Sequence, residues 1–135
     1  MSKITLEVWK PEGRMVEGEF DQVIVPGSEG DFGVLAGHTP FITRLRPGIL
    51  YGMNNGSEQR WAVHDGFVTV EADVVRIACE IAEKSTDIDT ERARQAQQRA
   101  EERLREKKTD TDFRRAEAAL HRAVARMSAA TGSAE

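Results

Sequence analysis

The sequence has a single cysteine, no excess of positive charge and no long apolar run. Cys79 has no partner for an internal disulfide, which is consistent with a reducing compartment. The 23 acidic side chains outnumber the 19 basic ones, whereas general nucleic-acid binders carry a marked basic excess. No apolar run approaches the roughly 18 residues of a membrane span, and the start lacks a signal-peptide core. We therefore expect no nucleic-acid binding, and membrane association only indirectly through a partner.

Glycine and proline are nearly absent from the last 50 residues, where only Gly132 occurs. Ten of the eleven glycines and all four prolines lie at or before Gly66. Charge divides at the same place: residues 1–85 carry 8 basic and 13 acidic side chains, and residues 86–135 carry 11 and 10. This shift in composition predicts two domains, residues 1–85 and residues 86–135.

Residues 1–85 show the pattern of short strands. Ile4, Leu6 and Val8 occupy every second position, which is the period of a half-buried strand. Further short apolar runs are separated by turn signals, among them Asn55-Gly56, which can supply the positive φ angles of a tight hairpin. Many short strands at this spacing indicate a β-sandwich or a barrel.

Residues 86–135 show the pattern of two helices, at about 89–107 and about 112–128. Asp89 is a candidate N-cap for the first, and Ile88 before it can pack against Ala93. A short polar turn at 109–112 offers the next N-cap and makes the helices antiparallel neighbours. The expected apolar face of the second helix consists of Phe113, Ala116, Leu120, Ala123, Val124 and Met127.

The helical half has little apolar surface to hold it in place. The first helix faces its neighbours mostly with Ala93, Ala96 and Ala100, and alanine buries little area at roughly 25 cal/mol per Å². High helix propensity keeps each helix intact when it is undocked. We expect stable helices with marginal packing, as a two-position switch requires.

The residue patterns contain no sign of catalysis or of a metal site. The glycines at 27, 30 and 33 are not followed by the lysine of a phosphate-binding loop, so they are best explained as ordinary loop glycines. No nucleophile is paired with a base. The residues that could ligate a metal are scattered, without ligand spacing: His38, His64, His121 and Cys79.

Two pairs of arginines lie at helical spacing. Arg92 and Arg99 are two turns apart on one face of the first helix, and Arg122 and Arg126 are one turn apart on the second. Antiparallel packing can bring the pairs together into a cluster that suits a polyphosphate. A solvated charged face is the more common explanation of such a pattern, and spacing alone leaves both open.

Five segments, in order and spanning nearly the whole chain, carry one family's motifs: Pro26–Pro40, Leu45–Gly48, Gly66–Val70, Ile88–Ala93 and Asp112–Glu117. The fourth has the form I-D-x-x-R-A. Together they resemble the epsilon subunits of bacterial F-type ATP synthases. The resemblance implies an α+β fold, an N-terminal ten-stranded β-sandwich followed by a C-terminal antiparallel two-helix hairpin.

The resemblance also implies a role. Such a subunit is not an enzyme; it couples the central rotor to the membrane ring and inhibits ATP hydrolysis through extended C-terminal helices. Its partners are the gamma subunit, the c-subunit ring and the alpha and beta subunits, at the cytoplasmic face of the cell membrane. It has no catalytic cofactor; regulatory ATP, whose magnesium dependence stays open, favours the folded, non-inhibitory form.

Site residues follow by motif position. The implied rotor-contact loop presents Glu29, Asp31 and His38. The implied ATP site consists of Glu83, Ile88, Asp89, Arg92, Ala93, Arg99, Arg122 and Arg126. Asp89 would bind adenine or cap and orient the turn, and the sequence leaves both roles open. The implied inhibitory helix uses Arg114, Arg115, Arg122 and Arg126, which give residues 113–128 a net charge of +3 against Glu117 alone.

Three alternatives remain beside this hypothesis. The first is the same subunit with only an assembly and coupling role and a vestigial ATP motif. The second is a free-standing ATP sensor, and the third a small adaptor that clamps partners with its arginine-rich hairpin. Co-purification with the other subunits separates the first from the other two.

Overall fold

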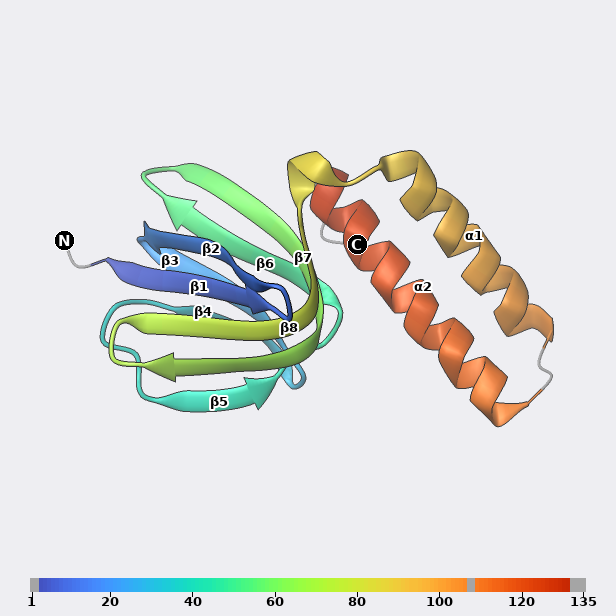
Figure 1. The fold of residues 1–135 in the computed structure, drawn as a ribbon, viewed down its shortest axis with the longest axis horizontal. Coiled ribbons are helices and arrows are strands. Elements are labelled where there is room, and N and C mark those ends of the chain that lie inside the picture. Colours follow the sequence, from blue (N-terminus) through green and yellow to red (C-terminus); the bar gives the residue numbers. More distant parts are fainter. Residues whose placement is uncertain (1–2, 107–108, 132–135) are drawn as a thin grey trace.

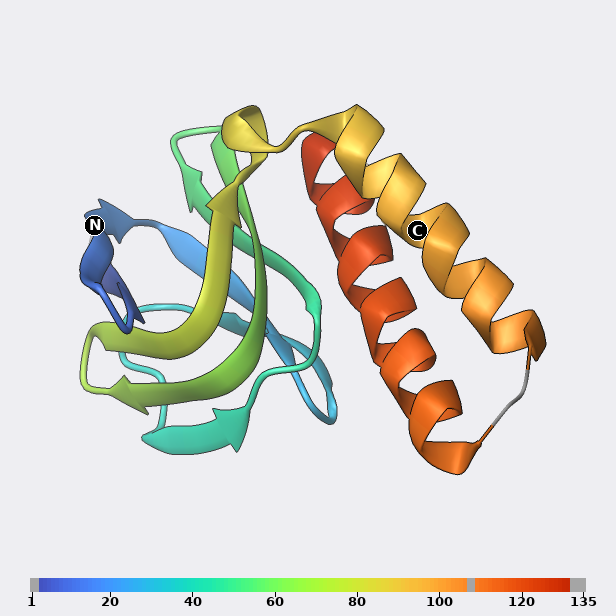
Figure 2. The same ribbon diagram turned by 45° about the vertical axis from the view of Figure 1, so that its right-hand side comes forward.

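The structure is a computed structural model that describes residues 3–106 and 109–131. It has two parts, a curved β-sandwich and a pair of helices lying along one side of it (Figures 1 and 2). The second helix lies between the sandwich and the first helix in both views. The expected α+β class, a sandwich followed by a two-helix hairpin, is confirmed.

Eight strands build the sandwich. They are β1 (Ile4–Lys10), β2 (Gly13–Phe20), β3 (Gln22–Gly27), β4 (Gly30–Val34), β5 (Phe41–Arg44), β6 (Gly48–Asn54), β7 (Ser57–Glu71) and β8 (Val74–Lys84). Their order is β2-β1-β8-β7-β6-β3-β4, with β5 paired to β7 outside this path. β1 and β8 pair in parallel, and the other pairs are antiparallel.

The count of ten expected strands depends on how β7 and β8 are divided. β7 pairs with β6 along its first half and with β5 along its second half, so it belongs to both layers. The change comes at Asp65, which has a positive φ of 60°, and at Gly66. A Cβ at Gly66 would lie 2.0 Å from the carbonyl oxygen of Ala78 on β8, so only glycine fits. Dividing both long strands at this bend gives ten.

The core of the sandwich consists of large, fully enclosed side chains. Ile4, Leu6 and Val8 are completely buried, which confirms the alternation expected for the first strand. Trp61 is buried against the edge of Phe20, with ring centroids 6.2 Å apart. This core lies between the two layers and makes no use of the helices.

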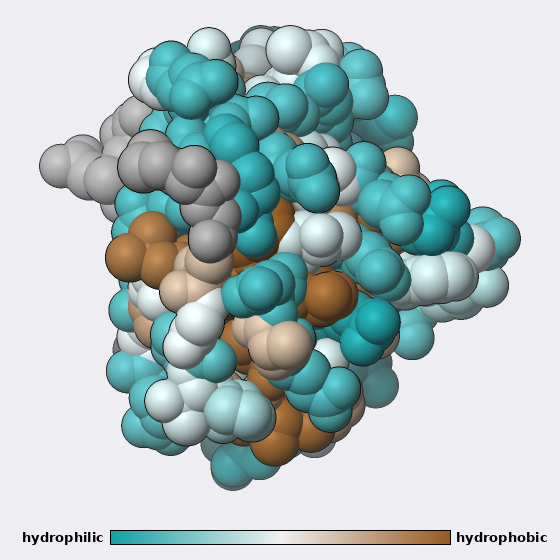
Figure 3. Space-filling model, turned by 90° about the vertical axis from the view of Figure 1, so that its left-hand side faces the viewer, coloured by the Kyte–Doolittle hydropathy of each residue, from teal (hydrophilic) through white to brown (hydrophobic). Residues whose placement is uncertain are grey.

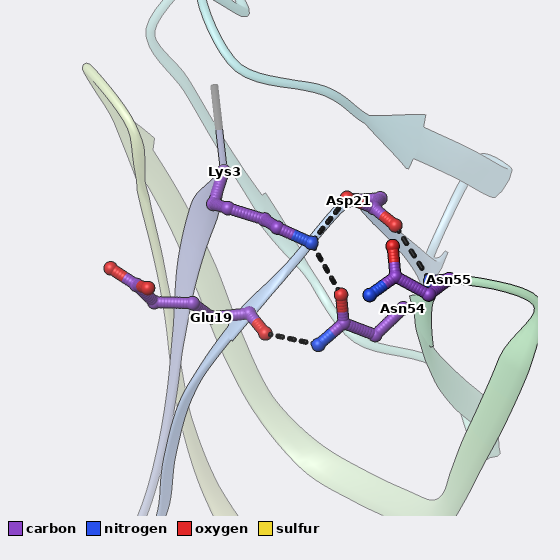
Figure 4. Close-up of polar contacts among 5 residues, drawn as sticks. All are labelled: Lys3, Glu19, Asp21, Asn54 and Asn55. Atoms are coloured by element: carbon purple, nitrogen blue, oxygen red, sulfur yellow. Dashed lines mark hydrogen bonds and ion pairs between the residues drawn. The ribbon is translucent and has the colours of Figure 1, made fainter. Parts of the chain in front are cut away.

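A polar network ties the start of β1 to two turns (Figure 4). Lys3 Nζ donates to Asp21 Oδ1 at 2.6 Å and to the side-chain oxygen of Asn54 at 2.5 Å. Asp21 Oδ2 also accepts from the backbone N–H of Asn55 at 2.8 Å, and Asn54 Nδ2 donates to the carbonyl of Glu19. The hydrogen bond from Lys3, followed by that from Asn55, holds the pKa of Asp21 below its ordinary value.

The helical half consists of a short 3-10 turn, η1 (Ser85–Asp87), and the helices α1 (Thr90–Glu106) and α2 (Asp110–Thr131). Asp89 Oδ1 accepts from the N–H of Arg92 at 3.1 Å, as expected of the N-cap. Thr109 Oγ1 accepts from the N–H of Asp112 at 3.0 Å, so α2 begins two residues earlier than expected. It also ends three residues later. The expected end of the first helix, at 107, lies outside the described residues.

Alanine dominates the packing of the hairpin. Ile88 and Ala93 lie in one small cluster with Ala62 of β7 and Ala129 of α2, which confirms the expected contact between the first two. Ala100 is buried as well, whereas Ala96 is half-buried. The expected apolar face of α2 holds from Ala116 to Met127 but not at its start, because Phe113 remains 40% exposed.

Candidate functional site

Two of the predicted ATP-site residues join the sandwich to the hairpin. Glu83, at the end of β8, forms an ion pair with Arg126 of α2, with Arg126 Nε 2.8 Å from Glu83 Oε1. The Nη2 group of Arg126 donates to Oε2 at 3.1 Å. The Nε atom is fully buried, and its contact with Oε1 is not a well-formed hydrogen bond. Both side chains are largely shielded from water. Moving α2 away would separate the two charges, and breaking a shielded ion pair is costly, so the pair stabilises the docked position of α2.

The I-D-x-x-R-A segment forms the corner between the two parts. Ile88 and Ala93 are buried beneath α2, while Asp89 and Arg92 are exposed above them. Asp89 uses one carboxylate oxygen as the N-cap of α1. Of the two roles considered for Asp89, the capping role is therefore present in the structure, and the second oxygen leaves room for a further contact.

The remaining arginines of the predicted site differ from Arg126 in their polar contacts. Within the described part of the chain, the side chains of Arg92, Arg99 and Arg122 form no ion pair or hydrogen bond. Ala93 and Ala129 belong to the same buried cluster, which indicates how α1 and α2 lie alongside each other. Arg99 lies about 9 Å from Ala93 along α1, and Arg122 about 10 Å from Ala129 along α2. The helices therefore present these two guanidinium groups at the same level.

The four predicted inhibitory arginines differ in exposure. Arg114 and Arg115 are exposed near the start of α2, where it projects beyond the sandwich. Arg122 and Arg126 are half-buried, and Arg126 is held by Glu83. The structure therefore separates an exposed outer pair from a half-buried inner pair, of which Arg126 is engaged in docking.

The predicted rotor-contact residues lie around one depression of the sandwich. Glu29, Asp31 and His38 line a cavity of about 290 Å³ together with Phe32 and Phe41. Arg46, which sequence reasoning did not single out, holds this loop in place. Its Nη2 pairs with Asp31, and its Nη1 donates to the carbonyl of Gly27 at 2.7 Å. The Leu45-Arg46-Pro47-Gly48 motif after a glycine-rich turn was the available signal, since the fork of an arginine can hold such a loop through a carboxylate and a backbone carbonyl.

Large apolar side chains are exposed mainly on the sandwich. Figure 3 shows apolar surface among the polar surface on the side opposite the hairpin. Among the described residues, seven of the eight exposed large apolar side chains belong to strands or loops of the sandwich: Trp9, Met15, Leu35, Phe41, Ile42, Phe67 and Ile81. Where such side chains form a contiguous patch, they mark a surface that binds other molecules.

Sequence reasoning missed Arg60 of β7. Its Nε donates to the carbonyl oxygen of Ala129 in the last turn of α2, at 2.8 Å. A lone arginine in a predicted strand gives no signal of such a contact, because its partner lies 69 residues away along the chain. It also missed a cavity of about 540 Å³ between α2 and the sandwich, which Ile49, Tyr51, Leu120 and Val124 line among others and which none of the eight predicted ATP-site residues lines.

Two family models match the chain and meet between its two parts. Residues 3–85 match the beta-sandwich domain of the ATP synthase delta/epsilon chain, and residues 86–131 match its long alpha-helix domain. This chain belongs to the ATP synthase delta/epsilon family. The resemblance expected from the sequence motifs is confirmed.

Curated relatives of this delta/epsilon chain are ATP synthase epsilon chains. That of Moorella thermoacetica is 46% identical over 96% of this chain and 98% of its own length. That of Myxococcus xanthus is 41% identical over 78% of this chain and 77% of its own. These relatives place the chain with the epsilon chains of the family.

Solved structures agree. A chain in the cryo-EM structure of the Euglena gracilis mitochondrial ATP synthase, containing OSCP, F1 and the c-ring, superimposes with a TM-score of 0.84 at 25% identity. The match covers 97% of this chain and 82% of that one. A chain of the Tetrahymena thermophila central stalk and c-ring shares the fold, with a TM-score of 0.54 at 16% identity over 64% of this chain and 70% of that one. In the described residues, neither helix has the length and apolar character needed to span a membrane.

Proposed function

We propose that this delta/epsilon chain couples the central rotor of the ATP synthase to the membrane ring and restrains ATP hydrolysis when its hairpin extends. ATP binding to the docked hairpin favours the non-inhibitory form. The ion pair between Glu83 and Arg126 carries the proposal. Two residues of the predicted ATP site, Glu83 and Arg126, also join α2 to the sandwich. A ligand at this site therefore binds differently to the docked and the extended hairpin.

The sandwich is the part that binds the rotor. Its exposed apolar side chains and the braced loop around Glu29, Asp31 and His38 support contacts with a gamma subunit and a c-subunit ring. The Euglena structure, which contains F1 and the c-ring, supports such surroundings. The proposed location is the cytoplasmic face of the membrane, held there by the complex.

The hairpin is the part that regulates. Arg92, Arg99 and Arg122 have no internal partners among the described residues, so a polyphosphate can engage them without first breaking an ion pair. Extension of the hairpin separates α2 from Glu83 and from β7, so ATP binds the docked form better. ATP at a hundredfold excess over its Kd stabilises the docked form by about 2.7 kcal/mol. That free energy is large beside the small contribution of an interface built from alanines. Extended, α2 presents its arginines to the alpha and beta subunits.

One observation favours the alternative with a vestigial ATP motif. Arg126 is already occupied by Glu83, so ATP has to share or displace that pair. If ATP fails to do so, the chain acts in assembly and coupling alone, and the arginines serve only docking and inhibition.

Calorimetric titration of the full chain with ATP tests the proposal. We expect Arg92→Ala to weaken ATP binding at least tenfold, about 1.4 kcal/mol. Arg94→Ala is the matched control, because Arg94 lies in the same turn of α1 but pairs outward with Glu91. Equal affinity in the Arg92 variant and the parent would remove the site. No binding of ATP to the parent would establish the vestigial alternative.

A further inference from the structure

The last turn of α2 contains no basic residue of its own. By contrast, the last turn of α1 carries Arg103 and Arg105. The final carbonyl groups of a helix lack partners and carry partial negative charge, which a nearby cation stabilises. Thr131 Oγ1 donates to the carbonyl oxygen of Met127 at 2.9 Å, and any cation that interacts with this end of α2 has to come from another element.

Arg60 of the sandwich supplies it. Its Nε donates to the carbonyl oxygen of Ala129 at 2.8 Å, and its Nη1 lies 3.0 Å from Glu58 Oε2. Glu58, on the same strand, thereby holds the guanidinium in the orientation in which it contacts the hairpin. Its side chain is only 24% exposed, so water weakens this contact less than it would at the open surface.

We propose that Arg60 is a nucleotide-independent anchor of the docked hairpin, acting on the C-terminal end of α2. The inference rests on the proposed function in taking extension of the hairpin as the inhibitory step. Arg60 is outside the predicted ATP site, and its contact with Ala129 exists only while α2 is docked. When α2 leaves, Arg60 keeps Glu58 and the sandwich keeps its fold.

Two anchors of different kinds therefore hold α2. Glu83 binds the Arg126 side chain, within the residues that ATP is proposed to engage. Arg60 binds the backbone of the last turn and stays in place whatever happens to Arg126. A docked hairpin then persists without nucleotide, and ATP adds to a position already favoured.

Distance measurement on the full chain tests the anchor. Spin labels on Glu71→Cys, in the sandwich, and Glu102→Cys, on α1, report the docked and extended populations. Native Cys79 is buried, with its pKa raised to about 11 by that burial, and stays unlabelled. Without nucleotide, we expect Arg60→Ala to raise the ratio of extended to docked chains about fivefold.

Matched variants separate anchoring from general damage. Arg60→Lys keeps the charge, so it should dock more fully than Arg60→Ala. If only the planar shape of the Arg60 guanidinium mattered, Arg60→Lys would behave like Arg60→Ala. Arg76→Ala, on β8 and paired with Glu7, is the control and should leave the ratio unchanged. If the extended form is too sparse in the parent, all variants are compared in a Glu83→Gln background, where one anchor is already lost.

The outcomes distinguish the anchor from the ATP site. An unchanged ratio in Arg60→Ala, in both the parent and the Glu83→Gln background, overturns the anchor even if ATP still drives docking. A raised ratio supports it even if ATP proves not to bind. A raised ratio that is equal in Arg76→Ala also overturns it, because the effect would then be general.

Discussion

The sandwich encloses Trp61, Leu50 and Ile77 completely, whereas the buried residues of the two helices are six alanines and one serine. Burying a large side chain removes much apolar area from water, whereas burying an alanine removes little. The sandwich is therefore held together by its own core, while the hairpin depends on helix propensity within and on a few polar contacts at the boundary. The difference allows one part to move while the other stays folded.

A matched pair of leucine truncations should give the largest contrast between the two parts. Leu50 of β6 is fully buried, whereas Leu120 of α2 is half-buried beside the cavity of about 540 Å³. We expect Leu50→Ala to lower the free energy of unfolding by about 2–5 kcal/mol. We expect Leu120→Ala to lower it by about 1 kcal/mol or less, because that side chain already faces open space.

Denaturant unfolding measures both values when tryptophan fluorescence is followed in a Trp9→Phe background, where Trp61 in the core of the sandwich is the tryptophan that remains. Equal losses of unfolding free energy in the two variants would mean that the hairpin and the sandwich share one core, and would contradict the difference between the two parts.

Removal of the hairpin should change stability less than Leu50→Ala does. A chain truncated after Lys84 keeps every strand and the whole sandwich core. We expect it to melt cooperatively, with Tm within about 5 °C of the parent, and to lose all restraint of ATP hydrolysis in the assembled enzyme. Circular dichroism and hydrolysis assays measure these two properties. A molten product under conditions where the full chain is soluble would show that the sandwich needs its helices.

A fall in pH should lower the stability of the sandwich by a smaller amount, through the polar network around Asp21. Lys3 holds the folded pKa of Asp21 below its ordinary value of 3.8. That stabilisation is therefore fully present above the ordinary pKa and is lost as pH falls through the lowered one. We expect Lys3→Met to lower Tm more at neutral pH than at strongly acid pH, where the contact with the Asp21 carboxylate no longer contributes and only the hydrogen bond to Asn54 is lost. Lys10→Met, at the far end of β1 and outside the network, is the control. A constant difference in Tm between Lys3→Met and the parent across the pH range would argue against the linkage.

Much of the fold could be predicted from local pattern. Alternation in Ile4, Leu6 and Val8 and the N-cap at Asp89 both reappear in the structure, because each depends on neighbours within a few residues. The start of α2 was missed by two residues, since Thr109 and Asp112 are both good caps and sequence alone does not rank them. The exposure of Phe113 was missed because helical spacing defines a face but not how far the partner surface extends along it.

The candidate site was predicted only as a set of residues. Motif positions named Glu83 and Arg126 together, but nothing in the spacing showed that they pair with each other across the boundary. The division of β7 and β8 into both layers likewise follows from the bend at Asp65 and Gly66, where the close approach of Ala78 requires the absence of a Cβ.

The sequence by itself determined the strands, the two helices, the N-cap of the first helix and the small apolar area of the interface between the helices, because propensity, periodicity and side-chain size act locally. Only the tertiary structure decided which groups hold the hairpin in place. Arg60 and Ala129 lie 69 residues apart, and Glu83 and Arg126 lie 43 apart. Contacts at such separations arise from how the chain folds back, so no local pattern encodes them.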